Sequence, residues 1–252
     1  MRFDDKRVLV TGASRGIGRA TALAFARGGA RVAVHYAEDE SAAEETLRRM
    51  EGQGHIRVPA RLDEAGAAEG LVADVVAQMG GLDILVNNAG IYLEHAIGQV
   101  DGEGWRTAWE KTLAVNLVAP ADLIYWASKT MIPAGGGRIV CVSSRGAFRG
   151  EPNHPAYGAS KAGLNAMAQS LAIALAPHHV FIGIVAPGFV ETDMAAAFLE
   201  GSAGDAIRAQ SPTGRVARPE EVAHAILFLA SEGAEFTTGS ILDVNGASYL
   251  RQ

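Results

Sequence analysis

Cysteine is almost absent from this chain of 252 residues, which contains Cys141 alone and therefore cannot form a disulfide within itself. Such usage is typical of proteins from a reducing compartment. Cys141 lies in the apolar run 139–142, and we interpret it as an inert core residue. No apolar run reaches the roughly 18 residues that a membrane-spanning helix needs, and the N-terminus lacks the pattern of a signal peptide. We therefore expect a cytoplasmic protein that has no membrane partner.

Positive charge is also in deficit, because 22 lysines and arginines face 28 aspartates and glutamates, which gives a formal net charge of -6. No basic run offsets this balance, so nucleic acid and anionic membranes are not expected as partners. Low-complexity tracts, linkers and repeats are absent as well. We therefore expect residues 1–252 to form a single domain.

Short β-branched runs alternate with longer alanine-rich helical patterns along the whole chain. Strands that are apolar on both sides and are each followed by a helix predict a parallel sheet with both faces covered. We predict the α/β class, with one doubly wound, Rossmann-type domain, a seven-stranded parallel sheet and helices on both faces. Ligands bind such sheets at the carboxyl ends of the strands. The predicted strands are 8–10, 32–34, 55–60, 84–86, 138–142, 180–185 and 241–244.

A glycine-rich loop, residues 11–18, follows the first predicted strand and opens a helix. Gly12 allows a tight turn, Gly16 leaves room for a pyrophosphate, and Gly18 lets the helix pack close to the strand. The helix N-terminus presents free N–H groups and partial positive charge to phosphates. Because the loop stands between a strand and a helix, it predicts a dinucleotide site.

The glycine spacing, Gly-x-x-x-Gly-x-Gly, resembles that of the short-chain dehydrogenase/reductase family, whose motif is Thr-Gly-x-x-x-Gly-Ile-Gly. Further motifs of that family match in order along essentially the whole chain, and the nearest-looking members are 3-oxoacyl-acyl carrier protein reductases and sugar or polyol dehydrogenases. The matching residues are 87–90 (Asn-Asn-Ala-Gly), Asn116, Ser144, Tyr157, Lys161, Pro187, Gly188, Thr192 and 243–246 (Asp-Val-Asn-Gly).

Tyr157 and Lys161 form a pair with acid/base chemistry of its own. They are four residues apart on a helical pattern, so they project from one face. A nearby ammonium lowers the pKa of a phenol from its usual value near 10 toward neutrality, where general acid/base catalysis works best.

The resemblance implies a catalytic tetrad of Asn116, Ser144, Tyr157 and Lys161. In reduction, a nicotinamide delivers hydride to a carbonyl carbon, Ser144 binds the oxygen and Tyr157 donates its proton. Lys161 binds the nicotinamide ribose throughout, and Asn116 holds a water in a proton relay. Ser143 is the competing candidate for the serine, and the family spacing to the tyrosine favours Ser144. Asn116 has an alternative interpretation as a helix-packing residue whose polar group is satisfied.

The cofactor is expected to be NADP, with NAD as the alternative. An NAD enzyme usually has an acid at the end of the second strand, where this chain has Tyr36, and Arg15 could meet a 2′-phosphate. Glu38 and Asp39 oppose this because they could repel a phosphate. The family's acid after the third strand is replaced by Arg61, so Asp63 is the candidate adenine contact. The predicted cofactor residues are Gly12, Ser14, Arg15, Gly16, Ile17, Gly18, Tyr36, Asp63, Asn88, Ala89, Gly90, Tyr157, Lys161, Pro187, Gly188, Val190 and Thr192; no metal ligands are expected.

The substrate is expected to be a small polar carbonyl, a sugar or a polyol. The loop after Ser144 is polar, with Arg145, Arg149, Glu151, Asn153 and His154, although these charges can simply face water. Residues 92–95 are another candidate wall, and residues 189–215 resemble a substrate lid.

A 3-oxoacyl thioester is the alternative substrate. Against it, residues 131–137 and 177–179 lack the lysines and arginines that would attract an acidic carrier protein. A remote alternative is a dinucleotide sensor without catalysis. Oligomerisation is implied by the resemblance alone, as a homotetramer formed through residues 105–131, residues 156–176 and the C-terminal strand.

Overall fold

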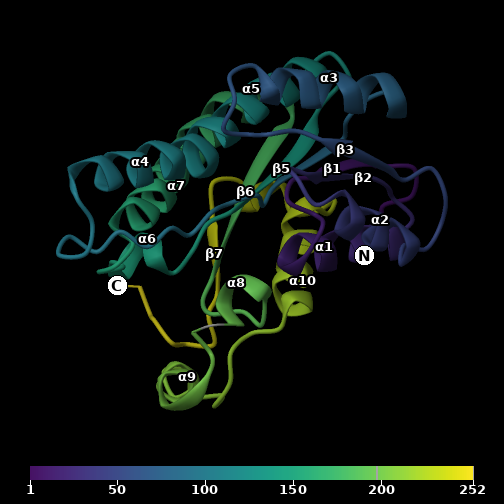
Figure 1. Ribbon diagram of the computed structural model, residues 1–252. Helices are drawn as coiled ribbons and strands as arrows, with labels where there is room; N and C mark the ends of the chain where they lie inside the picture. The colour runs from purple at the N-terminus through teal and green to yellow at the C-terminus, as the bar shows by residue number, and fades with distance from the viewer. Residues whose placement is uncertain (197, 252) are drawn as a thin grey trace.

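The computed structural model describes residues 1–196 and 198–251. Seven strands and ten α-helices alternate along this part of the chain (Figure 1). The strands are β1 Arg7–Val10, β2 Arg31–Tyr36, β3 Ile56–Pro59, β4 Ile84–Asn87, β5 Gly137–Val142, β6 Val180–Pro187 and β7 Ile241–Val244. The helices are α1 Gly16–Arg27, α2 Glu40–Arg48, α3 Ala67–Met79, α4 Gly102–Leu113, α5 Ala119–Met131, α6 Gly146–Arg149, α7 Pro155–Leu175, α8 Asp193–Ala196, α9 Gly201–Arg208 and α10 Pro219–Ala230.

All seven strands form one parallel sheet in the order β3-β2-β1-β4-β5-β6-β7. The predicted fold class is thereby confirmed. The order reverses between β1 and β4, and such a switch point leaves a crevice beyond the carboxyl ends of the two strands. The sheet thus determines where a dinucleotide would bind.

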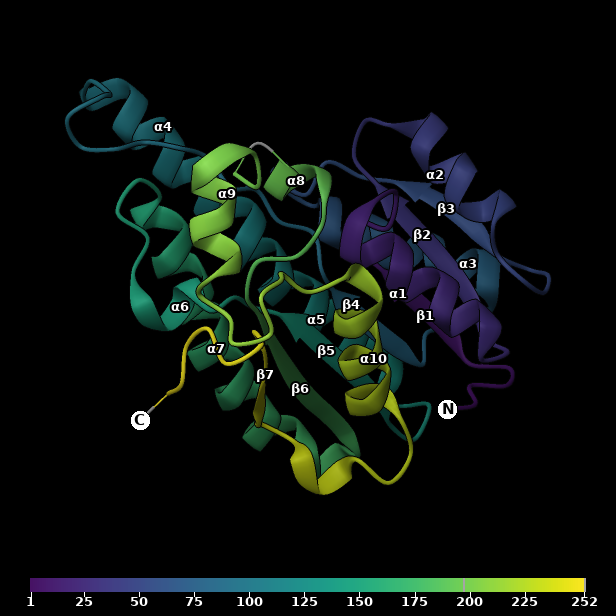
Figure 2. The same cartoon turned by 90° about the horizontal axis from the view of Figure 1, so that it is seen from below.

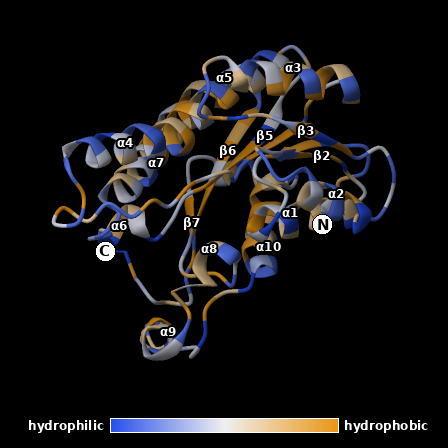
Figure 3. Cartoon of the chain, in the orientation of Figure 1, coloured by the Kyte–Doolittle hydropathy of each residue, from blue (hydrophilic) through white to orange (hydrophobic). Residues whose placement is uncertain are grey.

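Two helical layers cover the sheet, as Figure 1 shows, with α3, α4, α5 and α7 on one side and α1, α2 and α10 on the other. Each layer has its own hydrophobic cluster, one containing Phe25 and Ile226 and the other Leu123 and Leu164. The hydrophobic residues concentrate on the central strands (Figure 3). Because β4 and β5 are apolar on both faces, they are buried on both.

The helix predicted over 105–131 is interrupted. A π-helical turn, Ala114–Val118, joins α4 to α5 and carries Asn116. Single π-helical turns within α-helices are frequent at functional sites. The pattern of apolar residues does not predict this turn, because a single turn of altered hydrogen bonding has no sequence signature of its own.

Gly183 on β6 lies directly against helix α10. A β-carbon on Gly183 would lie 2.9 Å from the β-carbon of Leu229. The glycine therefore lets α10 pack directly against the strand, which is a local structural consequence away from the candidate site.

Helices α8 and α9 lie outside the two layers, in the segment predicted to be a lid (Figures 1 and 2). The lid and the single-domain organisation stay predictions; one sheet built from residues 7–244 favours the latter. Among residues 1–196 and 198–251, no helix combines the length and the hydropathy of a membrane span. The same residues contain no cluster of His, Cys, Asp and Glu that is suited to a metal ion.

Candidate active site

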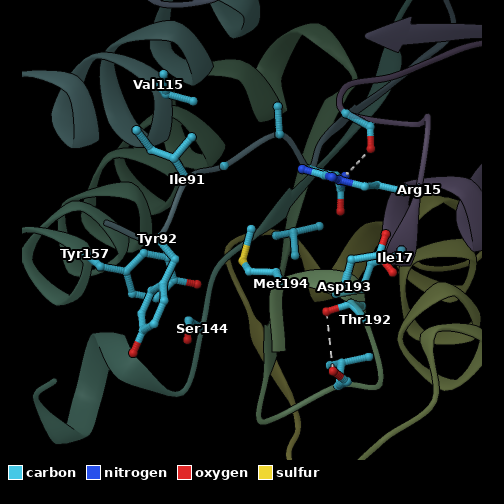
Figure 4. Close-up of a pocket in the computed structure, with 18 of the residues that line it drawn as sticks. Arg15, Ile17, Ile91, Tyr92, Val115, Ser144, Tyr157, Thr192, Asp193 and Met194 are labelled. Carbon is cyan, nitrogen blue, oxygen red and sulfur yellow. Dashed lines mark hydrogen bonds between the residues drawn. The ribbon is translucent and has the colours of Figure 1, made fainter. Parts of the chain in front are cut away.

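A cavity of about 730 Å³ extends across the carboxyl ends of the strands. Every residue predicted to contact the cofactor lines it, and so does Ser144. Figure 4 shows Arg15 and Ile17 on one side of this cavity and Ser144 and Tyr157 on the other. The structure thus brings a predicted phosphate loop and a predicted acid/base group into one space.

The glycine loop has the backbone shape that its sequence predicts. Gly12 and Gly16 have φ values of 61° and 54°, a backbone conformation that residues with a side chain rarely adopt. A β-carbon on Gly18 would lie only 2.1 Å from the carbonyl oxygen of Gly12. Larger residues here would close the space beside the N-terminus of α1, so the loop fits a pyrophosphate.

His35 supports this loop, although it belongs to none of the motifs. Its Nδ1 accepts a hydrogen bond of 2.9 Å from the N–H of Gly12, and its Nε2 lies 3.0 Å from the carbonyl oxygen of Ala60. Burial lowers the pKa of His35 to about 4, so the ring is neutral at pH 7. The imidazole therefore links the loop to the chain beyond β3.

Asn88 fixes the loop from the side of β4. Its side chain donates hydrogen bonds to the carbonyl oxygens of Thr11 and Gly12, at 2.8 and 3.2 Å. The hydroxyl of Thr11 accepts from the backbone N–H groups of Asn88 and Ala89, both at 2.9 Å. These bonds join the carboxyl ends of β1 and β4 at the switch point.

The end of the cavity beside β2 contains charges of both signs. Arg15 is exposed, and no salt bridge joins it to any residue within 1–196 and 198–251. Arg61 pairs with Glu38 and with Asp63, the latter at 3.4 Å. Tyr36, at the position where an acid selects NAD, is buried. A 2′-phosphate would therefore meet Arg15 as its free cation, while Glu38 would oppose it.

Tyr157 and Ser144 lie together at the other end. Burial raises the pKa of the Tyr157 phenol, a hydrogen bond with Ser144 acts to lower it, and the charge of Glu151 adds to the rise. The Oγ of Ser144 also accepts a hydrogen bond of 3.0 Å from the N–H of Gly146. The phenol is consequently protonated at neutral pH in this state, ready to act as an acid.

Ser143, the competing candidate, is directed elsewhere. Its hydroxyl is buried and donates to the backbone carbonyl of Lys161 at 3.4 Å. Ser144, which bonds Tyr157, is half-buried. This arrangement favours Ser144 as the residue that binds a substrate oxygen.

Lys161 is almost fully buried, with 4% of its surface exposed. Its Nζ donates to the carbonyl oxygen of Val142 at 2.8 Å and lies 5.8 Å from the ring centre of Tyr157. Burial lowers the pKa of Lys161 to about 8. A lysine held in this way remains largely charged at pH 7 and adjoins the tyrosine.

Asn116 lies behind the cavity wall instead of lining it. Its amide bonds the backbone of Ile91 twice, accepting from the N–H and donating to the carbonyl, both at 2.9 Å. It also donates to the hydroxyl of Ser160 at 3.3 Å. A β-carbon on Gly90 would lie 3.3 Å from Asn116 Oδ1 and 3.5 Å from Lys161 Nζ, so both atoms border one small space.

The loop after β6 closes the cavity over the glycine loop. A β-carbon on Gly16 would lie 3.2 Å from the Cγ2 of Thr192, and Val190 is buried beside it. Gly188 donates its N–H to Val244, and a β-carbon on it would lie 3.0 Å from that of Asn245. Thr192 therefore faces the phosphate loop, while Gly188 is held against the end of β7.

The wall nearest to Tyr157 is aromatic. Tyr92 stacks on His154 with ring centres 3.6 Å apart, and it meets Tyr157 edge-to-face at 4.7 Å. Of the polar residues 145–154 that were expected here, only Arg145 and Glu151 line the cavity. Tyr92 was foreseen as part of a wall, but its stacking partner was not.

Comparisons with known proteins agree with this geometry. A family model described as enoyl-(acyl carrier protein) reductase matches residues 12–247. The chain is 36% identical to the 3-oxoacyl-(acyl-carrier-protein) reductase of Escherichia coli, over 99% of this chain and 100% of that protein. It is 37% identical to the L-rhamnose 1-dehydrogenase (NAD(P)(+)) of a Sphingomonas species, over 98% of both chains. The solved structure of the angucycline C-6 ketoreductase LanV with bound NADP superposes with a TM-score of 0.88, at 34% identity over 98% of each chain.

Proposed function

Because the chain belongs to the short-chain dehydrogenase/reductase family, we propose that it is an NADP-dependent enzyme in which Tyr157 moves the proton of a carbonyl/alcohol pair. The observation that carries the proposal is that Tyr157, Ser144 and Lys161 line the same cavity as the glycine loop. The chain is thus an oxidoreductase, as its motifs predict.

The residues present fit a dinucleotide. The glycine loop leaves a cradle that β-carbons would fill, and the N-terminus of α1 offers its N–H groups to a pyrophosphate. When bound, the nicotinamide supplies or accepts the hydride. Arg15 is the residue of this chain that would hold a 2′-phosphate, and LanV, which is 34% identical, has NADP bound. NADP is therefore the cofactor we assign, with NAD as the weaker alternative.

The chemistry at the substrate oxygen falls to this chain's own residues. Ser144 hydrogen-bonds the carbonyl oxygen and stabilises the charge that develops on it. Tyr157 donates a proton to that oxygen during reduction and accepts one during oxidation. Lys161 favours the phenolate that remains after donation, and Asn116 holds the backbone at Ile91 so that the wall beside Gly90 stays in place.

The relatives name two substrate types, a 3-oxoacyl thioester and L-rhamnose. The expectation of a small polar carbonyl, sugar or polyol stays a prediction, as does the thioester alternative. Purified enzyme should be given acetoacetyl thioester with NADPH, and L-rhamnose with NADP, with NADH and NAD in parallel. Turnover that is lost in Tyr157→Phe while NADPH still binds supports the proposal. Turnover that persists in Tyr157→Phe contradicts it, and a protein that binds NADPH but turns over no carbonyl or alcohol would be a sensor.

We also propose a homotetramer in the cytoplasm. Large apolar side chains are exposed on the two long helices and near the C-terminus, among them Tyr125 (54%), Ile173 (80%) and Leu250 (75%). A partner chain seated on these helices and on the C-terminal segment would cover these side chains. Light scattering should give four times the chain mass of 26.3 kDa, and a monomer would refute the assembly. Cell fractionation tests the location.

A further inference from the structure

The substrate end of the cavity contains a group of aromatic and apolar side chains. Four of these line it, Tyr92 from the segment after β4, Phe189 from the loop after β6, and Met194 and Phe198 from the α8 region. Figure 4 shows Tyr92 and Tyr157 side by side, with Met194 across from them. We propose that the substrate is an uncharged, flat aromatic ketone, an inference that rests on the proposed function and names its substrate class.

The orientation of Tyr92 is fixed by its neighbours. His154 covers it at 3.6 Å with an angle of 11° between the planes, and Tyr157 stands at 90° to it. Aromatic contacts of this kind hold the geometry of Tyr92 because each of them restricts the same half-buried ring. The catalytic phenol therefore opens onto a rigid aromatic surface, against which a planar ring beside the carbonyl can pack.

The segment predicted to be a lid supplies exposed apolar partners. Phe198 meets Tyr92 edge-to-face at 5.8 Å, and 36% of its surface is exposed. Met194 on α8 is 50% exposed. Exposed phenylalanine and methionine on the wall of a cavity cost free energy in water, and an apolar ligand that covers them recovers it. A thioether beside an aromatic ring is itself a favourable contact.

The polar residues near this end are occupied with one another. Asn153 bonds Glu94 at 3.1 Å, Arg149 bonds Gln210 at 3.2 Å, and neither of the first-named residues lines the cavity. A sugar would need a separate partner for each hydroxyl that it buries. The arrangement is therefore poorly suited to the sugar or polyol that the sequence favoured.

Charged side chains of both signs also line this part of the cavity, Lys111 and Arg145 being positive and Glu151 and Asp193 negative. The carboxylate of Glu151 lies 3.5 Å from the hydroxyl of Tyr92. The guanidinium of Arg145 bonds Gln210 at 2.9 Å and Ser248 at 2.8 Å, which holds it toward the lid and the C-terminal segment. An acid or a phosphate would face Glu151, whereas a neutral ketone would not be repelled. In the reaction, the carbonyl carbon gains hydride from NADPH and the oxygen gains the proton of Tyr157.

The test compares two ketones of the same carbon skeleton, 2-tetralone and its saturated counterpart 2-decalone, with saturating NADPH. Neither carbonyl is conjugated to a ring, so their intrinsic reactivity is similar and recognition decides the ratio of kcat/KM. We expect kcat/KM to be about 3- to 10-fold higher for 2-tetralone, because this ratio corresponds to the free energy of an aromatic contact in proteins. Phe198→Ala should remove most of this preference by raising KM for 2-tetralone alone. Phe236→Ala, which truncates a fully exposed phenylalanine away from the cavity, is the matched control.

The outcomes separate this inference from the proposed function. Equal kcat/KM for the two ketones, or a preference for 2-decalone, overturns the aromatic substrate while Tyr157-dependent turnover stands. If the preference for 2-tetralone survives in Phe198→Ala, Tyr92→Leu is measured next. A preference that survives in this variant too shows that the aromatic wall is not its cause. Reduction of acetoacetyl thioester together with no reduction of either cyclic ketone overturns the inference alone. Absence of turnover with every ketone, while NADPH binds, overturns both.

Discussion

The imidazole of His35 accepts a hydrogen bond of 2.9 Å from the backbone N–H of Gly12, the first glycine of the phosphate loop. The other ring nitrogen lies 3.0 Å from the carbonyl oxygen of Ala60. One tautomer satisfies both contacts, with the proton on Nε2. A protonated ring would turn Nδ1 into a donor facing the N–H of Gly12, so the loop requires a neutral histidine.

Acid should therefore destabilise the enzyme through His35. Burial lowers its pKa to about 4, below the 6.5 of an ordinary histidine. The unfolded chain then takes up a proton that the folded chain refuses, so stability is complete above pH 6.5 and is lost as the pH falls toward 4. The free energy of unfolding should fall by on the order of 3 kcal/mol over this range. Urea titrations at several pH values measure it.

His35→Gln is the matched variant, because its amide can accept from Gly12 and donate to Ala60 without ever becoming charged. We expect it to flatten the pH dependence relative to wild type and to keep NADPH affinity. His35→Phe should leave the N–H of Gly12 unsatisfied and weaken NADPH binding. An unchanged pH dependence in His35→Gln would show that other groups cause the loss of stability in acid.

Lys161 should set an upper pH limit for ketone reduction. Burial lowers its pKa to about 8, so it loses its positive charge above that pH. A neutral lysine no longer favours the phenolate that Tyr157 becomes after giving up its proton. We expect kcat for reduction to approach a tenfold fall per pH unit above about 8, measured with saturating NADPH and ketone. A rate that stays constant from pH 7 to 10 would contradict this role.

The sheet and the positions of the motif residues were predictable because they depend on local patterns. The apolar runs predicted each strand, and the parallel register of Val10 with Val34 then places His35 beside the glycine loop. That contact joins residues 23 positions apart. His35 directly follows Val34, the last residue of β2 that pairs with β1. A histidine at this position is the signal that could have identified the contact.

Other features depend on tertiary contacts that no local pattern encodes. The stack of Tyr92 on His154 brings together two loops, and the polar character of residues 145–154 pointed to a polar pocket. In the structure, Asn153 is directed to Glu94, which leaves the rings to form the wall. The polar sequence of this loop therefore predicts that some of its side chains are exposed, but it does not predict which side chains line the cavity.

Cofactor preference should depend on opposite contributions from Arg15 and Glu38. Arg15→Gln removes the free cation expected at the 2′-phosphate and should weaken NADPH binding by about tenfold while leaving NADH nearly unchanged. Glu38→Gln removes a repelling charge and releases Arg61, so NADPH should bind more tightly. Arg27→Gln, an exposed arginine at the end of α1 that does not line the cavity, is the control. Equal losses for NADPH and NADH in Arg15→Gln would exclude a phosphate contact.

Gly90 provides a test of the proton relay that the family resemblance implies, because the β-carbon that it lacks would lie close to both Asn116 and Lys161. The added methyl of Gly90→Ala would lie 3.3 Å from Asn116 Oδ1 and 3.5 Å from Lys161 Nζ, which excludes a water from the space beside both atoms. We expect kcat to fall by at least tenfold and its solvent isotope effect to rise, since returning a proton to Tyr157 then becomes slower. Ala89→Gly, at the neighbouring position of the same loop, is the control for local disturbance. If Gly90→Ala weakens only NADPH binding and leaves kcat unchanged, the residue shapes the cofactor site and no relay passes beside it.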